Sequence, residues 1–252
     1  MNLHRREFLG TVAAAGATLI QGTLAAAPPR TIKAVAFDAF PLLDPRPIFA
    51  LVEELFPGKG ANLASQWRTR QFEYTWLRTI TGRYVDFWRV TEDALRFAAK
   101  TASIQLTPAQ EGKLMDGYLQ LKLWPDVEPV LRTLKEAGLK LGFLSNFTPK
   151  MLEAAATTAG LAATLDFALS TDAARSYKPD PKAYQLAVDH LGLKREEILF
   201  VAFAGWDAAG AKLFGYPTCW VNRLRLPAEE LGTTPDATDS TLGVVTRFLA
   251  LG

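Results

Sequence analysis

The sequence contains few of the residues that bind metals or carry redox chemistry. Its single cysteine, Cys219 in "PTCWVN", excludes a disulfide within the chain and a cysteine-based zinc cluster. With only two histidines, His4 and His190, a hydrolase mechanism of the Ser-His type is not expected, and we interpret His190 as a helix-end residue. The net charge is only +2 and the basic residues are scattered, so we predict no nucleic-acid partner.

The chain has the composition of a globular protein with a distinct N-terminal segment. Its 252 residues are 49% hydrophobic and 21% charged, which suits one or two packed domains. Residues 1–27 place "HRREFLG" before the apolar "TVAAAGATLI" and the small-residue end "TLAAAPP", the layout of a secretory signal. Arg5 and Arg6 resemble those of a twin-arginine export signal. We predict an export signal peptide at 1–27 and a periplasmic mature protein. Because the apolar stretch is shorter than the about 20 residues that span a bilayer, we predict no stable membrane insertion.

From residue 32 onward, short apolar runs alternate with helical patterns. "IKAVAFDAF", "LKLGFLSN", "FALST", "ILFVAFA" and "PTCWVNR" are typical of buried strands. Between or after them, "DVEPVLRTLKEAGL", "TPKMLEAAATTAGL", "DPKAYQLAVDHLGL" and "WDAAGAKLFG" show helical periodicity and end near glycine. We predict an α/β fold with a doubly wound, parallel-sheet, Rossmann-like core formed by residues 28–44 and 125–252. The tail from "LPAEELG" onward is expected to be a loop with a closing helix.

One segment interrupts the alternation. Residues 45–124 show helical stretches, such as "ANLASQWRTRQFEYTWLRTITG" and "YVDFWRVTEDALRFAAK", and no convincing strand. The segment is too long for a simple connection in an α/β unit. We predict that it is an inserted helical cap domain, which would lie over the strand ends and exclude water from a site there.

Polar residues follow four of the predicted strands. Asp38 follows the first, Ser145 and Asn146 end the second, Lys178 comes after the third and Asp207 after the fourth. Each alone is more often a helix cap than a catalytic group. Because the carboxyl ends of parallel strands lie at one edge, we expect these side chains to meet, with Lys178 neutralising Asp38 and held by Asp207.

This order of residues resembles the haloacid dehalogenase superfamily over nearly the whole mature chain. "WRTRQFEYTWLR", "GRYVDFWRVTEDALRF", "FLSN", "YKPDPKAY" and "FGYPTCWVNR" resemble the type II L-2-haloacid dehalogenases in particular. The resemblance implies hydrolysis of small L-2-halocarboxylates to 2-hydroxy acids. It also implies the site residues. The catalytic ones are Asp38 as nucleophile, Arg68 of the cap facing the halide, Lys178 and Asp207; the substrate-binding ones are Ser145, Asn146 and Tyr184, with Phe40, Phe72, Phe87 and Trp206 as apolar walls.

The residue types suit such a displacement without a metal or cofactor. An aspartate is ionised at neutral pH and can attack carbon, giving an ester on Asp38 that water then hydrolyses. Phosphatases of the superfamily place a second Asp two residues after the nucleophile, where this chain has Phe40. Asp207 has no acidic neighbour, and two separated carboxylates make a poor magnesium site. We therefore predict no metal and no cofactor.

Some positions depart from the family pattern, and two other functions remain open. The family has Gly-Thr where this chain has Pro41-Leu42, and Ser and Asn where it has Ala202 and Ala204. These changes threaten ester hydrolysis more than the first displacement. The alternatives are a degenerate family member that binds a small carboxylate, or a hydrolase of another substrate such as a phosphate ester. Family members often dimerise through the cap, and the aromatic "FEYTWLR" suits either a homodimer surface or the monomer core.

Overall fold

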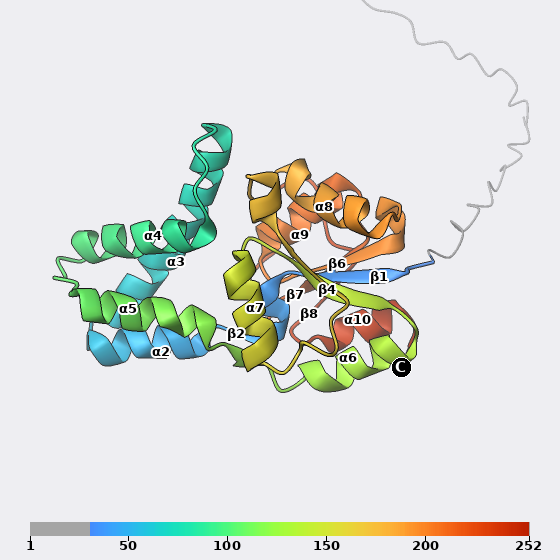
Figure 1. Cartoon of the computed structure of the whole chain (residues 1–252), viewed down its shortest axis with the longest axis horizontal. Helices are drawn as coiled ribbons and strands as arrows, with labels where there is room; N and C mark the ends of the chain where they lie inside the picture. The colour runs from blue at the N-terminus through green and yellow to red at the C-terminus, as the bar shows by residue number, and fades with distance from the viewer. Residues whose placement is uncertain (1–30, 252) are drawn as a thin grey trace, which may run out of the picture.

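The computed structural model describes residues 31–251, so the predicted export signal at 1–27 lies outside the described residues. A six-stranded sheet forms the centre of the fold, with the strand order β5-β4-β1-β6-β7-β8 and every neighbouring pair parallel (Figure 1). The strands are β1 (Ala34–Phe37), β4 (Lys140–Ser145), β5 (Phe167–Ser170), β6 (Ile198–Ala202), β7 (Thr218–Val221) and β8 (Ala237–Asp239). The five predicted strands and the parallel sheet are confirmed.

Helices cover both faces of this sheet. On one face lie α6 (Val127–Glu136), α7 (Pro149–Thr158) and α10 (Gly243–Phe248), and on the other α8 (Pro181–Leu191) and α9 (Gly205–Phe214) (Figure 1). Successive residues of a strand point to opposite faces, so Val35 and Phe37 pack in one apolar cluster and Ala36 in the other. The doubly wound arrangement explains why β1 is fully buried and reads as a continuous apolar run.

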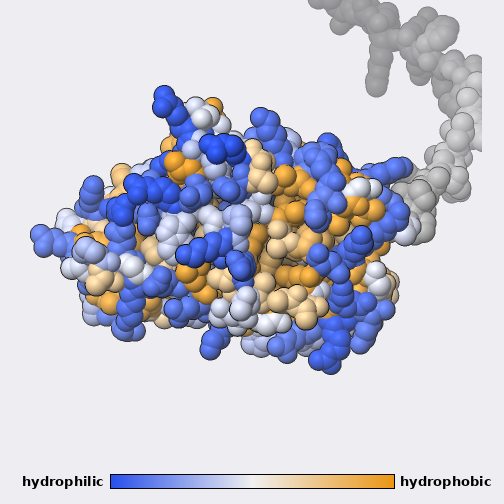
Figure 2. Space-filling model, viewed as in Figure 1, coloured by the Kyte–Doolittle hydropathy of each residue, from blue (hydrophilic) through white to orange (hydrophobic). Residues whose placement is uncertain are grey.

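Sequence between β1 and α6 forms a second, mostly helical region. It contains α1 (Ala39–Leu42), α2 (Arg46–Leu55), α3 (Gly60–Ile80), α4 (Phe87–Thr101) and α5 (Pro108–Asp116), with a 3₁₀ turn at Gly117–Leu119. The long helices α3 and α4 pack together, and the Trp67 indole donates to the Thr91 carbonyl at 2.9 Å. On the face drawn in Figure 2, these helices present mainly hydrophilic side chains, whereas apolar side chains gather over the sheet region.

Short strands that the sequence did not predict complete the fold. β2 (Leu43–Asp44) and β3 (Lys122–Leu123) pair antiparallel at the two ends of the helical region. The expectation of no strand within 45–124 is therefore wrong for β3. The expectation of a loop in the tail is wrong for β8, although α10 is the predicted closing helix. Within residues 31–251, none of the helices has the length and apolar composition needed to span a membrane.

Candidate active site

The carboxyl edge of the sheet brings the predicted polar residues together. Asp38 directly follows β1 and caps α1, and Ser145 is the last residue of β4. Lys178 lies in the loop between β5 and α8, and Asp207 lies in the first turn of α9, after β6. Since β1 lies between β4 and β6, these segments meet beside Asp38.

Lys178 bridges the two carboxylates. Its Nζ lies 2.9 Å from Asp38 Oδ1 and 2.6 Å from Asp207 Oδ2. The side chains of Lys178 and Asp207 are 1% and 2% exposed, whereas that of Asp38 is 13% exposed. Of these three residues, Asp38 is therefore the one that solvent reaches. A buried ammonium between two carboxylates compensates charges that would be costly to bury alone.

Burial and charge act on these groups in opposite directions. Burial raises the pKa of Asp207 to about 6; the nearby Lys178 ammonium opposes that rise and the Asp38 carboxylate adds to it. For Lys178, burial lowers the pKa, but the charges of Asp207 and Asp38 outweigh it and raise the pKa above its usual value. The lysine is therefore protonated at neutral pH, and Asp207 is the group whose protonation changes just below neutral pH.

Tyr184 holds Asp207 from behind. It is fully buried on α8, and its hydroxyl donates to Asp207 Oδ1 at 2.7 Å. The α9 backbone approaches it closely: a Cβ on Gly210 would come within 2.7 Å of the Tyr184 hydroxyl and 2.6 Å of Pro179 Cβ. The structure thus places Tyr184 behind Asp207, outside the residues that line the cavity next to Asp38.

Ser145 and Asn146 lie on the opposite side of Asp38. The Ser145 hydroxyl donates to Asp38 Oδ1 at 3.3 Å and accepts from the Phe147 amide. Asn146 Oδ1 accepts two hydrogen bonds at 3.1 Å, from the Thr171 hydroxyl and the Lys178 amide. Because these two donors hold the oxygen, the NH₂ group of Asn146 points away from them. Asn146 also lines the cavity.

The cavity beside Asp38 is small and walled by aromatic rings. It has a volume of about 20 Å³, room for about one water molecule. All four predicted apolar wall residues line it, and two further rings that the sequence did not indicate complete the wall: Phe40, Phe72, Phe87 and Trp206, with Phe147 and Phe203. Phe40 packs edge-on against Phe147, with ring centroids 5.3 Å apart, and Phe72 against Trp206 at 5.1 Å. Phe147 directly follows Asn146, so its position after the second strand was the available signal.

Arg68 lies in the neighbouring cleft. Its guanidinium stands over the Phe203 ring, 5.6 Å from the centroid, and it does not line the cavity with Asp38. The cleft measures about 1020 Å³ and shares Phe72, Phe203 and Trp206 with the small cavity. Arg68 makes no hydrogen bond or ion pair within residues 31–251, and its burial lowers its pKa. A charged guanidinium without a counter-ion is suited to attract an anion that enters the cleft.

The start of α9 has the alanines noted in the sequence. Ala202 is fully buried at the end of β6, and Ala204 lines the cavity as the residue before α9. Ala204 has no side-chain oxygen to cap the helix, so the first amides of α9 have no such partner, and this end of the helix lines the cavity through Ala204, Trp206 and Asp207. Asp207 supplies the carboxylate in that first turn, where it also interacts favourably with the helix dipole.

The site side chains do not form the donor set that a metal ion requires. Within the described part of the chain, no three His, Cys, Asp or Glu side chains cluster in a way that suits a metal ion. Between the two site carboxylates, the Lys178 ammonium occupies the place that a cation would take.

Comparison with known proteins gives a consistent set of relatives. The family model of a haloacid dehalogenase-like hydrolase matches residues 18–215. An (S)-2-haloacid dehalogenase of Pseudomonas sp. (strain YL) is 45% identical over 206 residues, which are 81% of this chain and 89% of that protein. Among solved structures, the L-2-haloacid dehalogenase RSc1362 is 44% identical with a TM-score of 0.86, covering 87% of this chain and 99% of that one. The Xanthobacter autotrophicus L-2-haloacid dehalogenase with chloropropionic acid covalently bound is 34% identical, with a TM-score of 0.81 over 87% of this chain and 98% of that one.

Proposed function

This chain belongs to the haloacid dehalogenase-like hydrolase family, and we propose from that premise that it hydrolyses L-2-haloalkanoic acids to 2-hydroxy acids. The match to the relatives named as 2-haloacid dehalogenases extends over most of the length of each relative, which supports the reaction class. The observation that carries the proposal is the Asp38 carboxylate, held by Lys178 at the edge of an aromatic cavity.

The first step is a displacement at carbon. Asp38 Oδ1 is occupied by Lys178 and Ser145, whereas Oδ2 accepts one hydrogen bond, from the Phe40 amide at 3.3 Å. Oδ2 therefore keeps lone pairs for attack on C2 of the haloacid. The C–O bond forms as the C–halogen bond breaks, so the halide leaves with the bonding electrons and C2 is inverted. The dry aromatic walls leave the carboxylate weakly solvated, which favours attack.

Approach of the substrate requires positive charge and N–H donors, because nucleophile and substrate are both anions. Lys178 neutralises Asp38 directly. The Asn146 amide and the first amides of α9 offer hydrogen bonds to the substrate carboxylate, and Arg68 in the adjoining cleft offers a charge for the carboxylate or the departing halide.

Hydrolysis of the ester is the second step. A water attacks Cγ of Asp38, the acyl C–O bond breaks, and the 2-hydroxy acid leaves as the carboxylate is restored. Asp207 lines the same cavity and, with a pKa of about 6, is ionised at neutral pH and able to take the proton from that water. Ala202 and Ala204 give this water no side-chain partner, so we expect the second step to limit turnover.

The test measures halide release from L- and D-2-chloropropionate, with and without chelator. We expect release from the L-isomer alone, unchanged by chelator, and none from Asp38→Asn, while the surface variant Asp189→Asn keeps the parent rate. A single turnover in ¹⁸O-water should place the label in Asp38. Ligand binding without product would indicate a carboxylate-binding protein instead, and activity on phosphate esters that requires magnesium would indicate a phosphatase.

Export belongs to the proposal as well. The "HRREFLG" segment and the small residues before Pro28 support a cleaved twin-arginine signal and a periplasmic mature protein. N-terminal sequencing of protein recovered from periplasmic and cytosolic fractions tests this. Full-length protein confined to the cytosol would refute it.

We further propose that residues 45–124 act as a cap domain on a core of 28–44 and 125–252, and that the cap supports a homodimer. In "FEYTWLR", Phe72 and Trp76 pack on Trp206 within the chain. Near the C-terminal end of α3, Leu77 and Ile80 are 54% and 82% exposed, which supports contact with a second copy. Light scattering of the parent and of Ile80→Glu tests the dimer; a monomeric parent would refute it.

A further inference from the structure

The turn after Asp38 is fixed by two residues that the mechanism above does not use. The indole Nε1 of Trp124 lies 3.0 Å from the carbonyl oxygens of both Phe40 and Leu43. The remaining two carbonyls of residues 40–43 also accept hydrogen bonds: that of Leu42 from the Trp124 amide at 3.0 Å, and that of Pro41 from Arg223 Nη2 at 2.8 Å. Four successive carbonyls thus receive donors from Trp124 and Arg223.

These carbonyls need partners from elsewhere in the chain. α1 is a single turn, so its last carbonyls have no N–H groups of a following turn to bond. Pro41, Leu42 and Leu43 are buried, which leaves water little access to them. A buried carbonyl without a donor is costly, so the conformation of this turn depends on the two donors.

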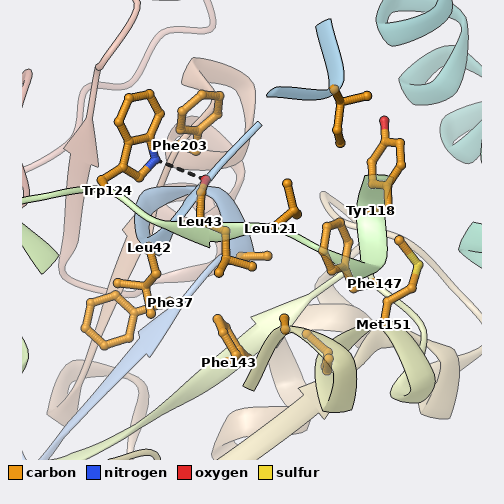
Figure 3. Packing of buried hydrophobic residues seen from close by; sticks show 14 of the residues in the cluster. Phe37, Leu42, Leu43, Tyr118, Leu121, Trp124, Phe143, Phe147, Met151 and Phe203 are labelled. Atoms are coloured by element: carbon orange, nitrogen blue, oxygen red, sulfur yellow. Dashed lines mark hydrogen bonds between the residues drawn. The ribbon is translucent and has the colours of Figure 1, made fainter. Parts of the chain in front are cut away.

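The donors are themselves fixed in place. Figure 3 shows the Trp124 indole nitrogen pointing to a carbonyl beside Leu42 and Leu43, with the Phe203 ring nearby. The Arg223 guanidinium lies 4.4 Å from the Trp124 ring centroid and pairs with Asp126 at 3.0 Å. Asp126 also accepts from the Leu242 amide at 2.7 Å, which ties this arrangement to the C-terminal segment.

The backbone turn at residues 40–43 sets the direction of the Asp38 carboxylate. Asp38 is the residue that caps α1, and its Oδ2 accepts from the Phe40 amide inside the same turn. The side chain of Leu42 is apolar and offers no hydroxyl to the carboxylate. A shift of the 40–43 backbone would therefore move Oδ2 and the contact of Oδ1 with Lys178 together.

We propose that Trp124 and Arg223 are positioning residues for Asp38: through the carbonyls of residues 40–43 they orient its carboxylate for attack on C2. This inference rests on the proposed dehalogenase function. It assigns both residues an effect on the rate of the displacement, since a misplaced nucleophile loses rate even when the substrate still binds.

The test compares two variants with chemically matched controls. Trp124→Phe removes the indole N–H and keeps an aromatic ring, and Arg223→Met removes the guanidinium and keeps much of the chain length. Trp88→Phe removes an indole N–H that makes no contact with the turn at residues 40–43, because Trp88 lines a separate pocket between α4 and α5. Arg195→Met removes a guanidinium with the same two kinds of contact: it donates to the Phe214 carbonyl at 3.0 Å and stacks on the Phe214 ring.

For each protein, kcat and KM for L-2-chloropropionate are measured, and the crystal structures of Trp124→Phe and Arg223→Met are determined. We expect kcat to fall by about tenfold or more in both site variants with KM within about twofold of the parent, and both controls to keep the parent values. In the crystals, Asp38 Oδ1 should move away from its 2.9 Å contact with Lys178 Nζ.

Parent-like kcat in both site variants would overturn the inference. A parent that releases no halide would refute the proposed function separately, and the crystal structures would then decide the positioning role. If the Asp38 carboxylate stays in place in the crystal structures of both variants, the positioning role of Trp124 and Arg223 is overturned.

Discussion

Replacing Lys178 by Met should destabilise the protein far more than the loss of an ordinary ion pair. The Nζ atom lies 2.9 Å from Asp38 and 2.6 Å from Asp207, and the lysine side chain is 1% exposed. Its removal leaves two facing carboxylates without a cation. Breaking a buried pair in this way costs about 3–5 kcal/mol. For a chain of this size that corresponds to a fall in Tm on the order of 10 °C.

The pH dependence of this loss has a definite sign. In the parent, the pKa of Asp207 in the folded protein is about 6, above its ordinary value of 3.8, so this group stabilises the fold less as pH rises from about 4 through 6. Without the ammonium that opposes the rise, the pKa goes higher still. The Tm difference between Lys178→Met and the parent should therefore widen between pH 5 and pH 8.

Thermal unfolding followed by circular dichroism across that pH range provides the assay. Lys135→Met is the control, because Lys135 pairs with Asp166 at a similar 2.9 Å but both side chains are 36% exposed. We expect a cost below about 1 kcal/mol for it. A Lys178→Met protein that loses no more stability than this control, at every pH, would refute the reasoning.

Three further outcomes follow from the site and its packing. Turnover should fall as pH drops below about 6, because Asp207 must be ionised to accept a proton from water; a pH–rate profile that stays flat from pH 7 to 5 would contradict this. Tyr184→Phe removes the 2.7 Å hydrogen bond that lowers the pKa of Asp207, so the acid limb of the same profile should move to higher pH by about one unit. Gly210→Ala should cost about 1–3 kcal/mol of unfolding free energy, because the new Cβ would lie 2.6 Å from Pro179 Cβ; urea unfolding beside Gly112→Ala, where nothing lies within 4 Å, measures the difference.

The central strands and the convergence of Asp38, Ser145, Lys178 and Asp207 could be predicted because both follow from local pattern. Buried parallel strands are continuous apolar runs, and their carboxyl ends must share one edge. β8 was missed because it is a short edge strand: Ala237–Asp239 is only partly buried and carries polar residues, so no apolar run marks it.

The finer arrangement of the site depends on packing that sequence spacing does not contain. Arg68 and Phe72 lie one turn apart on α3, which places them on the same face of the helix. Whether the guanidinium reaches Asp38 depends on the Phe203 ring, which lies under Arg68 and belongs to a segment far away in the chain. In the same way, Trp124 and Arg223 contact the turn at residues 40–43 across long sequence separations. Arg223 ends the "FGYPTCWVNR" segment, but nothing in that segment or around Trp124 points to this turn.

The small volume of the aromatic cavity has a consequence for the populations of the molecule in solution. A space of about 20 Å³ holds about one water, whereas a haloacid is several times larger. The closed arrangement suits the hydrolytic step, in which one water meets the ester. For a haloacid to fit, we expect the rings of Phe72, Phe203 and Trp206, which line both the cavity and the cleft, to move apart. The smaller the fraction of molecules in which the rings are apart, the weaker the apparent affinity for substrate. Substitutions that shift the equilibrium between closed and open rings should therefore change KM without altering any group that performs the chemistry.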